Sequence, residues 1–323
     1  MEKQYLNKKN ASTLVVACWL AYTLAYVGRL NYNANLIEVI TSLSVSKAEA
    51  GTVSAAFFMA YGIGQLGNGI ISRFYNGKWA IFGALIASAV INFAMPMLPN
   101  VEAMRVFWLG NGIAQSFLWC NLIRILAKNL SDQHMPGAIF AMSTTVAVGT
   151  FLAYGLSALC VTLFTWRWMF MLSSVTLVVA GIVWMLFLTR VERAGGDFSP
   201  NGPKQTGEKL KTSPWLIGSI IVFGLLGLGN GFVKDGVITW TPSLLFERFQ
   251  LSSAFSIAVT LVIPLLSVLG AWIAKWLTRR HVAHMAQSGL LFGAASALLA
   301  VAAGALSSLY LPVMMAILVG IAC

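Results

Sequence analysis

The chain has 323 residues, of which 58% are hydrophobic and only 10% are charged, with a mean hydropathy of +0.79. A soluble domain carries about a quarter of its residues as charges, so this composition excludes an ordinary soluble protein. The formal net charge of +11 does not indicate nucleic-acid binding, because the basic residues stand at the ends of apolar segments, where membrane topology expects them.

Ten apolar segments follow one another along the chain. The hydrocarbon core of a bilayer is about 30 Å thick and needs roughly 20 helical residues, a length that most of these segments reach. The first segment is too long for a signal peptide and contains no small-residue cleavage site. We therefore predict an all-α integral membrane protein embedded in a lipid bilayer. The segments span residues 12–34, 50–73, 79–98, 102–126, 137–163, 166–189, 215–245, 253–277, 286–306 and 309–323.

A polar linker separates six of these segments from the other four. It runs from Arg190 to Pro214 and contains four glycines and two further prolines among charged residues, which is typical of a flexible loop. We predict an N-terminal six-helix half over residues 1–193, a linker over 194–214 and a C-terminal half over 215–323.

The basic residues alternate between the two sides of the predicted membrane. With the N-terminus and every second loop placed in the cytoplasm, fifteen of the 21 Lys and Arg residues lie on that side and four lie opposite. This is a strong positive-inside bias. It predicts a multi-pass protein of the inner (cell) membrane with a cytoplasmic N-terminus and a cytoplasmic linker.

The two remaining basic residues, Arg29 and Lys234, lie deep inside the first and seventh segments. A charge at mid-membrane costs at least about 2.5 kcal/mol, so such a residue persists where it faces a wet cavity or has a partner. Arg29 could instead reach the membrane surface or pair with Glu38, and Lys234 could pair with Asp235. Adjacent residues on a helix do not face each other, so the second pairing requires a broken helix. We expect both cations to face a cavity.

Polar residues keep a helical period around the first of these cations. Tyr22, Tyr26, Arg29 and Asn33 follow one another in steps of four, three and four, so they share one helix face. Hydroxyl groups, a guanidinium and an amide are poorly placed against lipid. This face therefore requires water, a ligand or another helix.

The second segment repeats the pattern. Tyr61, Gln65 and Asn68 have the same period within the glycine-rich run of residues 61–69. Small residues let membrane helices approach closely. We expect this run to serve partly for helix packing and partly to line a pore.

These segments resemble the major facilitator superfamily and, within it, the organophosphate:phosphate antiporters. Residues 22–29, Tyr-Thr-Leu-Ala-Tyr-Val-Gly-Arg, are similar to the family segment with two tyrosines seven and three residues before the substrate arginine. Residues 60–65, Ala-Tyr-Gly-Ile-Gly-Gln, match the alanine-tyrosine-glycine stretch that carries a pocket tyrosine. Residues 233–242, Val-Lys-Asp-Gly-Val-Ile-Thr-Trp-Thr-Pro, are similar to the segment with the second substrate cation.

The resemblance implies a major facilitator fold, in which two pseudo-symmetric six-helix halves place their first and seventh helices in equivalent positions. About ten of the expected twelve helices are present, and the tenth segment ends after about 22 Å of helix, so we expect a C-terminally truncated chain. The residues implied in substrate binding are Arg29, Lys234, Tyr22, Tyr26, Tyr61, Gln65 and Asn33. Those implied in coupling or gating are Asp235, Arg73 and Arg105, the last resembling the superfamily's arginine–glycine motif together with Gly110 and Gly112.

The chain also departs from the family pattern. Arg73 stands where the superfamily has an aspartate, which removes a gating salt bridge, and Gln65 stands where glycerol-3-phosphate members have a lysine. Residues 119–124 replace a tryptophan-proline-proline-cysteine-glycine run. Residues 143–149 lack the family's polar asparagine or histidine.

The function implied is secondary transport of an organic phosphate or related anion in exchange for inorganic phosphate, by a monomer with no cofactor. A proton-coupled symporter would need a carboxylate in the bundle, for which Asp235 and Glu38 are candidates, whereas Gly28 stands where such symporters have an aspartate. A sugar-phosphate sensor that does not transport is a second alternative. An enzyme is disfavoured because the sequence has no His-Glu-x-x-His motif. The four cysteines lack motif spacing, so we expect core residues and neither a disulfide nor a metal site.

Overall fold

A computed structural model describes residues 5–200 and, with gaps, residues 218–265. The chain divides into two compact units, Met1–Gln205 and Thr206–Cys323. In the second unit, helix α9 (Ser253–Thr260) begins at Ser252, whose hydroxyl accepts a hydrogen bond from the backbone N–H of Phe255. Lys234 and the predicted segments beyond residue 265 lie outside the described residues.

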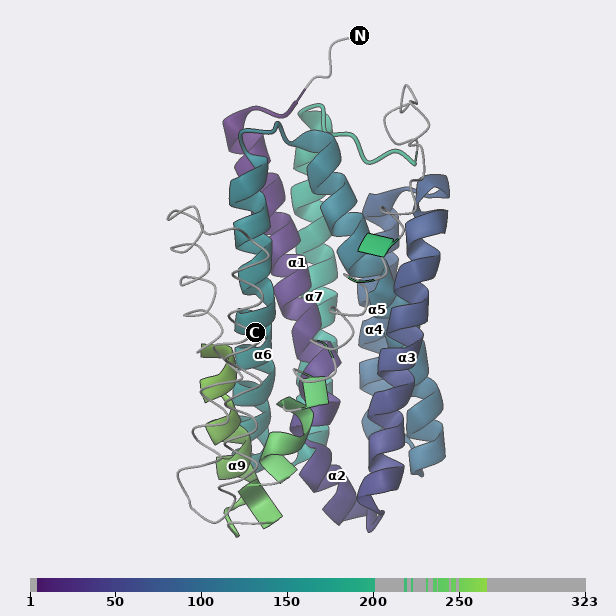
Figure 1. Ribbon diagram of the computed structural model, residues 1–323, viewed down its shortest axis with the longest axis vertical. Coiled ribbons are helices and arrows are strands. Elements are labelled where there is room, and N and C mark those ends of the chain that lie inside the picture. Colours follow the sequence, from purple (N-terminus) through teal and green to yellow (C-terminus); the bar gives the residue numbers. More distant parts are fainter. Residues whose placement is uncertain are drawn as a thin grey trace. The chain divides into compact units, whose positions relative to one another are not determined.

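The first unit is a helical bundle (Figure 1). Every described regular element in the chain is a helix, as the sequence predicts. The six apolar segments predicted for this half are all present, and the first is followed after Asn35 by an additional short helix. The helices are α1 (Lys8–Ala34), α2 (Leu36–Leu43), α3 (Lys47–Ile71), α4 (Gly77–Ala94), α5 (Val101–Asn129), α6 (Met135–Leu163) and α7 (Trp166–Arg193), with the short turns η1 (Ser72–Phe74) and η2 (Met95–Met97).

Polar caps determine where several of these helices begin. The side chains of Asn7, Asn76 and Asn100 each accept a hydrogen bond from a backbone N–H in the first turn of α1, α4 and α5. Helix α3 has a capping box, in which Ser46 and Glu49 bond each other's backbone N–H groups. The hydrogen bonds from the Ser46 hydroxyl and backbone N–H lower the pKa of the Glu49 carboxyl.

Helix α1 packs against both α6 and α7, while α3 packs against α5, and α4 packs against α5 and α7. Glycines permit two of the closest approaches. A methyl group at Gly149 of α6 would lie 2.5 Å from the Tyr26 Cβ atom of α1, and one at Gly112 of α5 would overlap the backbone carbonyl oxygen of Phe57 in α3. Backbones at these positions are close enough that larger residues would separate the helices.

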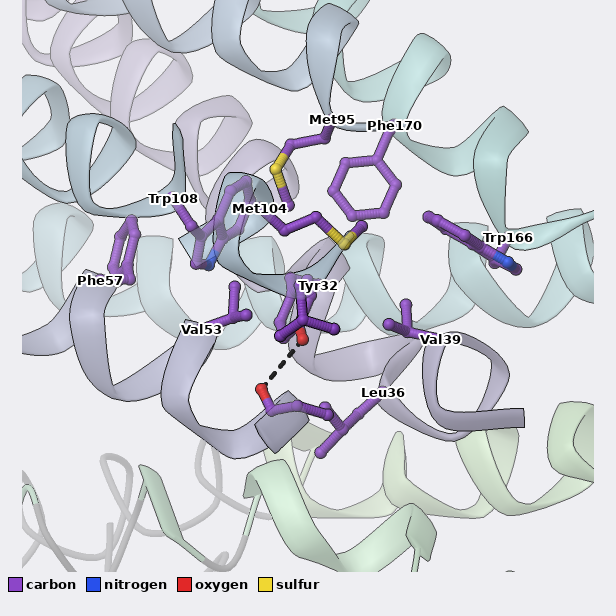
Figure 2. Close-up of a cluster of buried hydrophobic side chains, with 12 residues drawn as sticks. Tyr32, Leu36, Val39, Val53, Phe57, Met95, Met104, Trp108, Trp166 and Phe170 are labelled. Carbon is purple, nitrogen blue, oxygen red and sulfur yellow. Dashed lines mark hydrogen bonds between the residues drawn. The ribbon is translucent and has the colours of Figure 1, made fainter. Parts of the chain in front are cut away.

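A buried apolar cluster closes the bundle around α2 (Figure 2). It joins α1, α2, α3, η2, α5 and α7. The Tyr32 hydroxyl at its centre donates a 2.9 Å hydrogen bond to the Ala50 carbonyl oxygen, so α1 is bonded directly to α3 here. The buried members are Tyr32, Leu36, Val39, Ala50, Val53, Phe57, Met95, Val101, Met104, Trp108, Trp166 and Phe170.

Ion pairs close the opposite end of the bundle. The Lys78 Nζ atom lies 2.7 Å from Glu192 Oε2, and the Lys128 Nζ atom lies 2.7 Å from Asp197 Oδ2. Burial raises the pKa of the Asp197 carboxyl, but the hydrogen bonds from Lys128 and Ser199 outweigh burial, so the net shift is downward. The last turn of α7 is thereby joined to the start of α4, and the residues that follow α7 are joined to the end of α5.

The described helices have the length and composition of membrane spans. Four of them, α1, α4 with η2, α6 and α7, are long and apolar enough to cross a membrane. Helices α3 and α5 contain 25 and 29 residues, which is long enough, but they include more polar residues. Large apolar side chains such as Ile63, Leu66 and Leu186 remain exposed on the bundle, as expected where lipid is the solvent. The protein is a multi-pass membrane protein.

Candidate functional site

The Arg29 side chain lies among aromatic rings. Its guanidinium carbon is 4.0 Å from the centre of the Tyr61 ring, 5.1 Å from that of Tyr26 and 5.5 Å from that of Phe57. Arg29 is 8% exposed. Aromatic faces attract a cation most strongly where water is excluded, so these rings stabilise the buried charge without neutralising it.

Tyr61 links α3 to α1 at this position. Its hydroxyl oxygen lies 3.4 Å from the Tyr22 hydroxyl of α1 and accepts a 2.5 Å hydrogen bond from the Gln65 amide, one turn along α3. The Tyr22 ring in turn contacts the Trp119 ring of α5, with 5.0 Å between centroids. The structure therefore brings together five of the predicted residues, which we name the Arg29 cluster: Tyr22, Tyr26, Arg29, Tyr61 and Gln65.

Asn33 lies one turn beyond Arg29 on the same helix. Its side-chain oxygen accepts a 2.7 Å hydrogen bond from the Ser54 hydroxyl of α3. Asn33 is 3% exposed. It therefore contributes to the contact between α1 and α3 directly beside the Arg29 cluster.

The predicted gating arginines lie away from this cluster. Arg73 is exposed in η1, where its guanidinium carbon lies 4.8 Å from the centre of the Phe74 ring. Arg105 is exposed near the start of α5, at the opposite end of the bundle. Asp235 is half-buried in a helical part of the second unit. The opposition of Arg29 and Lys234 across a cavity remains a prediction.

Sequence reasoning missed Cys120 as a neighbour of this cluster. Cys18 and Cys160 are buried, as predicted for core residues, but Cys120 is half-buried, and its thiol lies 2.7 Å from the Gln65 side-chain oxygen. An apolar surrounding sequence gave no sign of this contact. Trp119, adjacent in sequence, belongs to residues 119–124, which depart from the family pattern.

The cluster has the chemistry of an anion site. Arginine offers a planar fork of N–H donors that matches two oxygens of a phosphate or carboxylate. The phenol groups of Tyr22, Tyr26 and Tyr61 supply hydroxyl donors around it. Among the described residues, no group of His, Cys, Asp and Glu could hold a metal ion.

Comparison with known sequences gives a family match over most of the chain. The profile of the Major Facilitator Superfamily matches residues 18–323. The chain is 25% identical over 169 residues to the membrane sensor protein UhpC of Escherichia coli K12, which covers 52% of this chain and 38% of the sensor. It is 23% identical over 300 residues to the glycerol-3-phosphate transporter of Bacillus subtilis, covering 86% of this chain and 67% of that protein.

Other similarities agree with these. A probable hexose phosphate transport protein of Chlamydia trachomatis is 21% identical over 183 residues, which cover 57% of this chain and 40% of that protein. Among solved structures, an inward-facing, unoccupied bacterial homolog of the human lysosomal transporter Spinster aligns over 98% of this chain and 73% of its own, with a TM-score of 0.69 and 18% identity. This last similarity concerns the fold.

Proposed function

The chain belongs to the Major Facilitator Superfamily, and we propose that it is a secondary active transporter that moves an organic phosphate, or a related small organic anion, by alternating access and in exchange for inorganic phosphate. The observation that carries the proposal is the buried Arg29 guanidinium held among Tyr26, Phe57 and Tyr61. The relatives named as glycerol-3-phosphate and hexose phosphate transport proteins support the substrate class.

Arg29 and Lys234 would bind the anion from the two halves of the protein. The arginine fork would bind two phosphate oxygens, and the lysine would act as a point charge. A bound anion neutralises both cations and draws the halves together. An empty site leaves two cations in a medium of low dielectric constant, which disfavours the closed state and therefore favours exchange over leak.

A proton-coupled symporter is the first alternative. It requires a titratable carboxylate in the transport path, and Asp235 and Glu38 are the candidates. Glu38 lies half-buried in the first turn of α2. At the position where such symporters have an aspartate, a methyl group on Gly28 would overlap the Leu177 Cδ1 atom, so a carboxylate there would require the Leu177 side chain to move. The absence of a carboxylate at this position favours exchange.

A sensor is the second alternative, and similarity to the sensor UhpC favours it specifically. A sensor would use the same Arg29 cluster to bind a sugar phosphate without releasing it on the other side of the membrane. Binding assays alone do not separate the two functions. Transport of labelled ligand into vesicles does.

We propose that the N-terminus and the linker lie on the cytoplasmic side of the inner membrane. The function is tested with the full-length protein in proteoliposomes that are loaded with inorganic phosphate. Labelled glycerol 3-phosphate, glucose 6-phosphate, phosphate and a hexuronate are offered outside. We expect saturable uptake of at least one phosphorylated compound, lost in Arg29→Ala. Binding without uptake would support the sensor, and uptake that Arg29→Ala leaves unchanged would remove the Arg29 cluster as the site.

A further inference from the structure

A second group of polar side chains lies on the side of α1 that faces α4, α5 and α7. The members come from four helices, and each is at most 2% exposed. We name them the amide network. They are Asn31 of α1, Ser88 and Asn92 of α4, Asn111 and Gln115 of α5, and Ser173 of α7.

The donors of this network converge on backbone carbonyls of α1. The Asn92 and Asn111 amides donate to the Gly28 carbonyl oxygen at 3.1 and 3.0 Å. The Gln115 amide donates to the Ala25 carbonyl at 3.3 Å, and the Ser173 hydroxyl lies 3.3 Å from the Val27 carbonyl. Three helices therefore bond the helical turn that ends immediately before Arg29.

The members also bond one another. The Ser88 hydroxyl donates to the Asn111 side-chain oxygen and accepts from the Gln115 amide at 3.0 Å. The Asn31 amide donates to the Asn92 oxygen at 2.7 Å and to the Ser173 hydroxyl at 3.0 Å. A buried network whose members are mutually bonded is rigid, because each bond fixes the orientation of the next group.

Close packing at one glycine makes the network possible. A methyl group at Gly28 would overlap the Leu177 Cδ1 atom of α7 and would lie 3.2 Å from the Asn92 amide nitrogen. The absence of a side chain at Gly28 leaves room for the Leu177 side chain of α7 and the Asn92 amide of α4 beside the α1 backbone. A larger residue here would displace one or both of these side chains.

The hydrogen bonds of the amide network are directional, so they can fix the rotation of α1 about its axis. Contacts between apolar side chains are nearly non-directional, whereas a hydrogen bond weakens steeply when its angle departs from the preferred range. Hydrogen bonds to carbonyls at three positions fix one axial rotation and one register of α1. Buried polar groups that specify register are the best supported use of such groups in helix packing.

We propose that the amide network, with Asn111 at its centre, positions α1 so that the Arg29 guanidinium is held against the Tyr61 ring for anion binding. The inference rests on the proposed function. The network residues do not touch the anion. They act through the α1 backbone, whereas the Arg29 cluster makes the contacts.

The experiment measures the affinity of the full-length protein for inorganic phosphate by calorimetry in detergent, together with thermal unfolding. Asn111→Ala removes one of the two amide bonds to the Gly28 carbonyl and the partner of the Ser88 hydroxyl. Asn129→Ala is the matched control, because Asn129 is a buried asparagine of the same helix whose amide donates to the Ile125 and Asp197 carbonyls instead. Gln115→Met provides a second network variant that keeps the side-chain volume, for use if Asn111→Ala does not fold.

We expect both asparagine variants to unfold at lower temperature, but only Asn111→Ala to bind phosphate about tenfold more weakly, the order found when hydrogen bonds that orient a ligating group are removed. In an Arg29→Lys background, Asn111→Ala should weaken binding far less, because a point charge depends less on orientation. Equal affinities of Asn111→Ala and Asn129→Ala, or additive losses with Arg29→Lys, would overturn the positioning role. Unchanged binding in Arg29→Ala would instead overturn the proposed anion site.

Discussion

At the scale of single residues, the sequence pattern around Arg29 predicts which side chains share a helix face but not which side chains of other helices they contact. The spacing of Tyr22, Tyr26 and Arg29 was enough to place them on one face, because the geometry within a helix depends only on sequence separation. The contact of Arg29 with Tyr61 was implied only through family resemblance. Contacts such as that between Tyr22 and Trp119 of α5 depend on tertiary packing, which no spacing within α1 encodes.

The first residue-scale prediction concerns the shape of the cation. Arg29→Lys keeps the charge but loses the guanidinium fork that lies 4.0 Å from the centre of the Tyr61 ring, so the binding free energy for phosphate should weaken by about 1–2 kcal/mol, which is roughly tenfold in affinity. Arg105→Lys, at an exposed position far from the cluster, is the matched control and should bind as the parent does. Calorimetric titration with phosphate measures both. Equal affinity of the two variants would show that the fork makes no contact.

The second residue-scale prediction separates the ring of Tyr61 from its hydroxyl. Tyr61→Phe keeps the ring 4.0 Å from the guanidinium but removes the partner of Gln65 and Tyr22. We expect a loss of about 1 kcal/mol in binding free energy, typical of one hydrogen bond. Tyr61→Leu should lose more, because the aromatic face is also removed. If the two variants bind phosphate equally, the ring does not contribute to holding Arg29.

At the scale of elements, the six segments predicted for the N-terminal half are confirmed, but an additional helix was not predicted. The first apolar segment ends at residue 34 as predicted, and a further helix, α2, follows Asn35. The Asn35 amide bonds the Asn31 carbonyl at 2.7 Å and the Ser157 hydroxyl of α6 at 3.0 Å. Asparagine side chains compete with the backbone for hydrogen bonds and so interrupt helices. The continuation as α2 depends on the buried cluster with α3 and α7, which sequence periodicity does not reveal.

The contact between α3 and α5 gives an element-scale prediction. A methyl group at Gly112 would overlap the carbonyl oxygen of Phe57, a backbone atom that cannot rotate away. Gly112→Ala should therefore lower the free energy of unfolding by about 1–3 kcal/mol, as overpacking typically does. At Gly110 on the same helix, the nearest atom is Ile91 Cδ1 at 3.5 Å, an ordinary contact.

Gly110→Ala is thus the matched control for that change. Alanine has a higher helix propensity than glycine by about 1 kcal/mol, so this variant should unfold at the same temperature as the parent or higher. Thermal unfolding in detergent compares the two. A Gly112→Ala protein as stable as Gly110→Ala would mean that α3 and α5 are not in the close contact described.

At the scale of the whole molecule, the sequence predicted the membrane-protein class and the family, but not the polar contacts in the interior of the bundle. The bilayer constrains each segment separately, through its length, its apolar composition and the Lys and Arg residues at its ends. Each segment can therefore be predicted from its own sequence. The resemblance to the major facilitator superfamily is confirmed by the match over residues 18–323. The amide network was not predicted, because its members are single polar residues in four separate apolar segments. Only the fold brings Asn31, Ser88, Asn111 and Ser173 together.

The coupling mechanism is a property of the whole transporter, and it yields the last prediction. In an exchanger, the unloaded protein returns slowly because no bound anion draws the two halves together, so uptake requires a second anion inside. In a proton symporter, a carboxylate takes up a proton with the substrate, so an inwardly directed proton gradient alone drives uptake. We expect the full-length protein to take up labelled organic phosphate when the vesicles contain phosphate, with little response to a proton gradient. Robust proton-driven uptake into phosphate-free vesicles, lost in Asp235→Asn but retained in Glu102→Gln at an exposed position of α5, would establish symport instead, because only the first change removes a carboxylate from the candidate transport path.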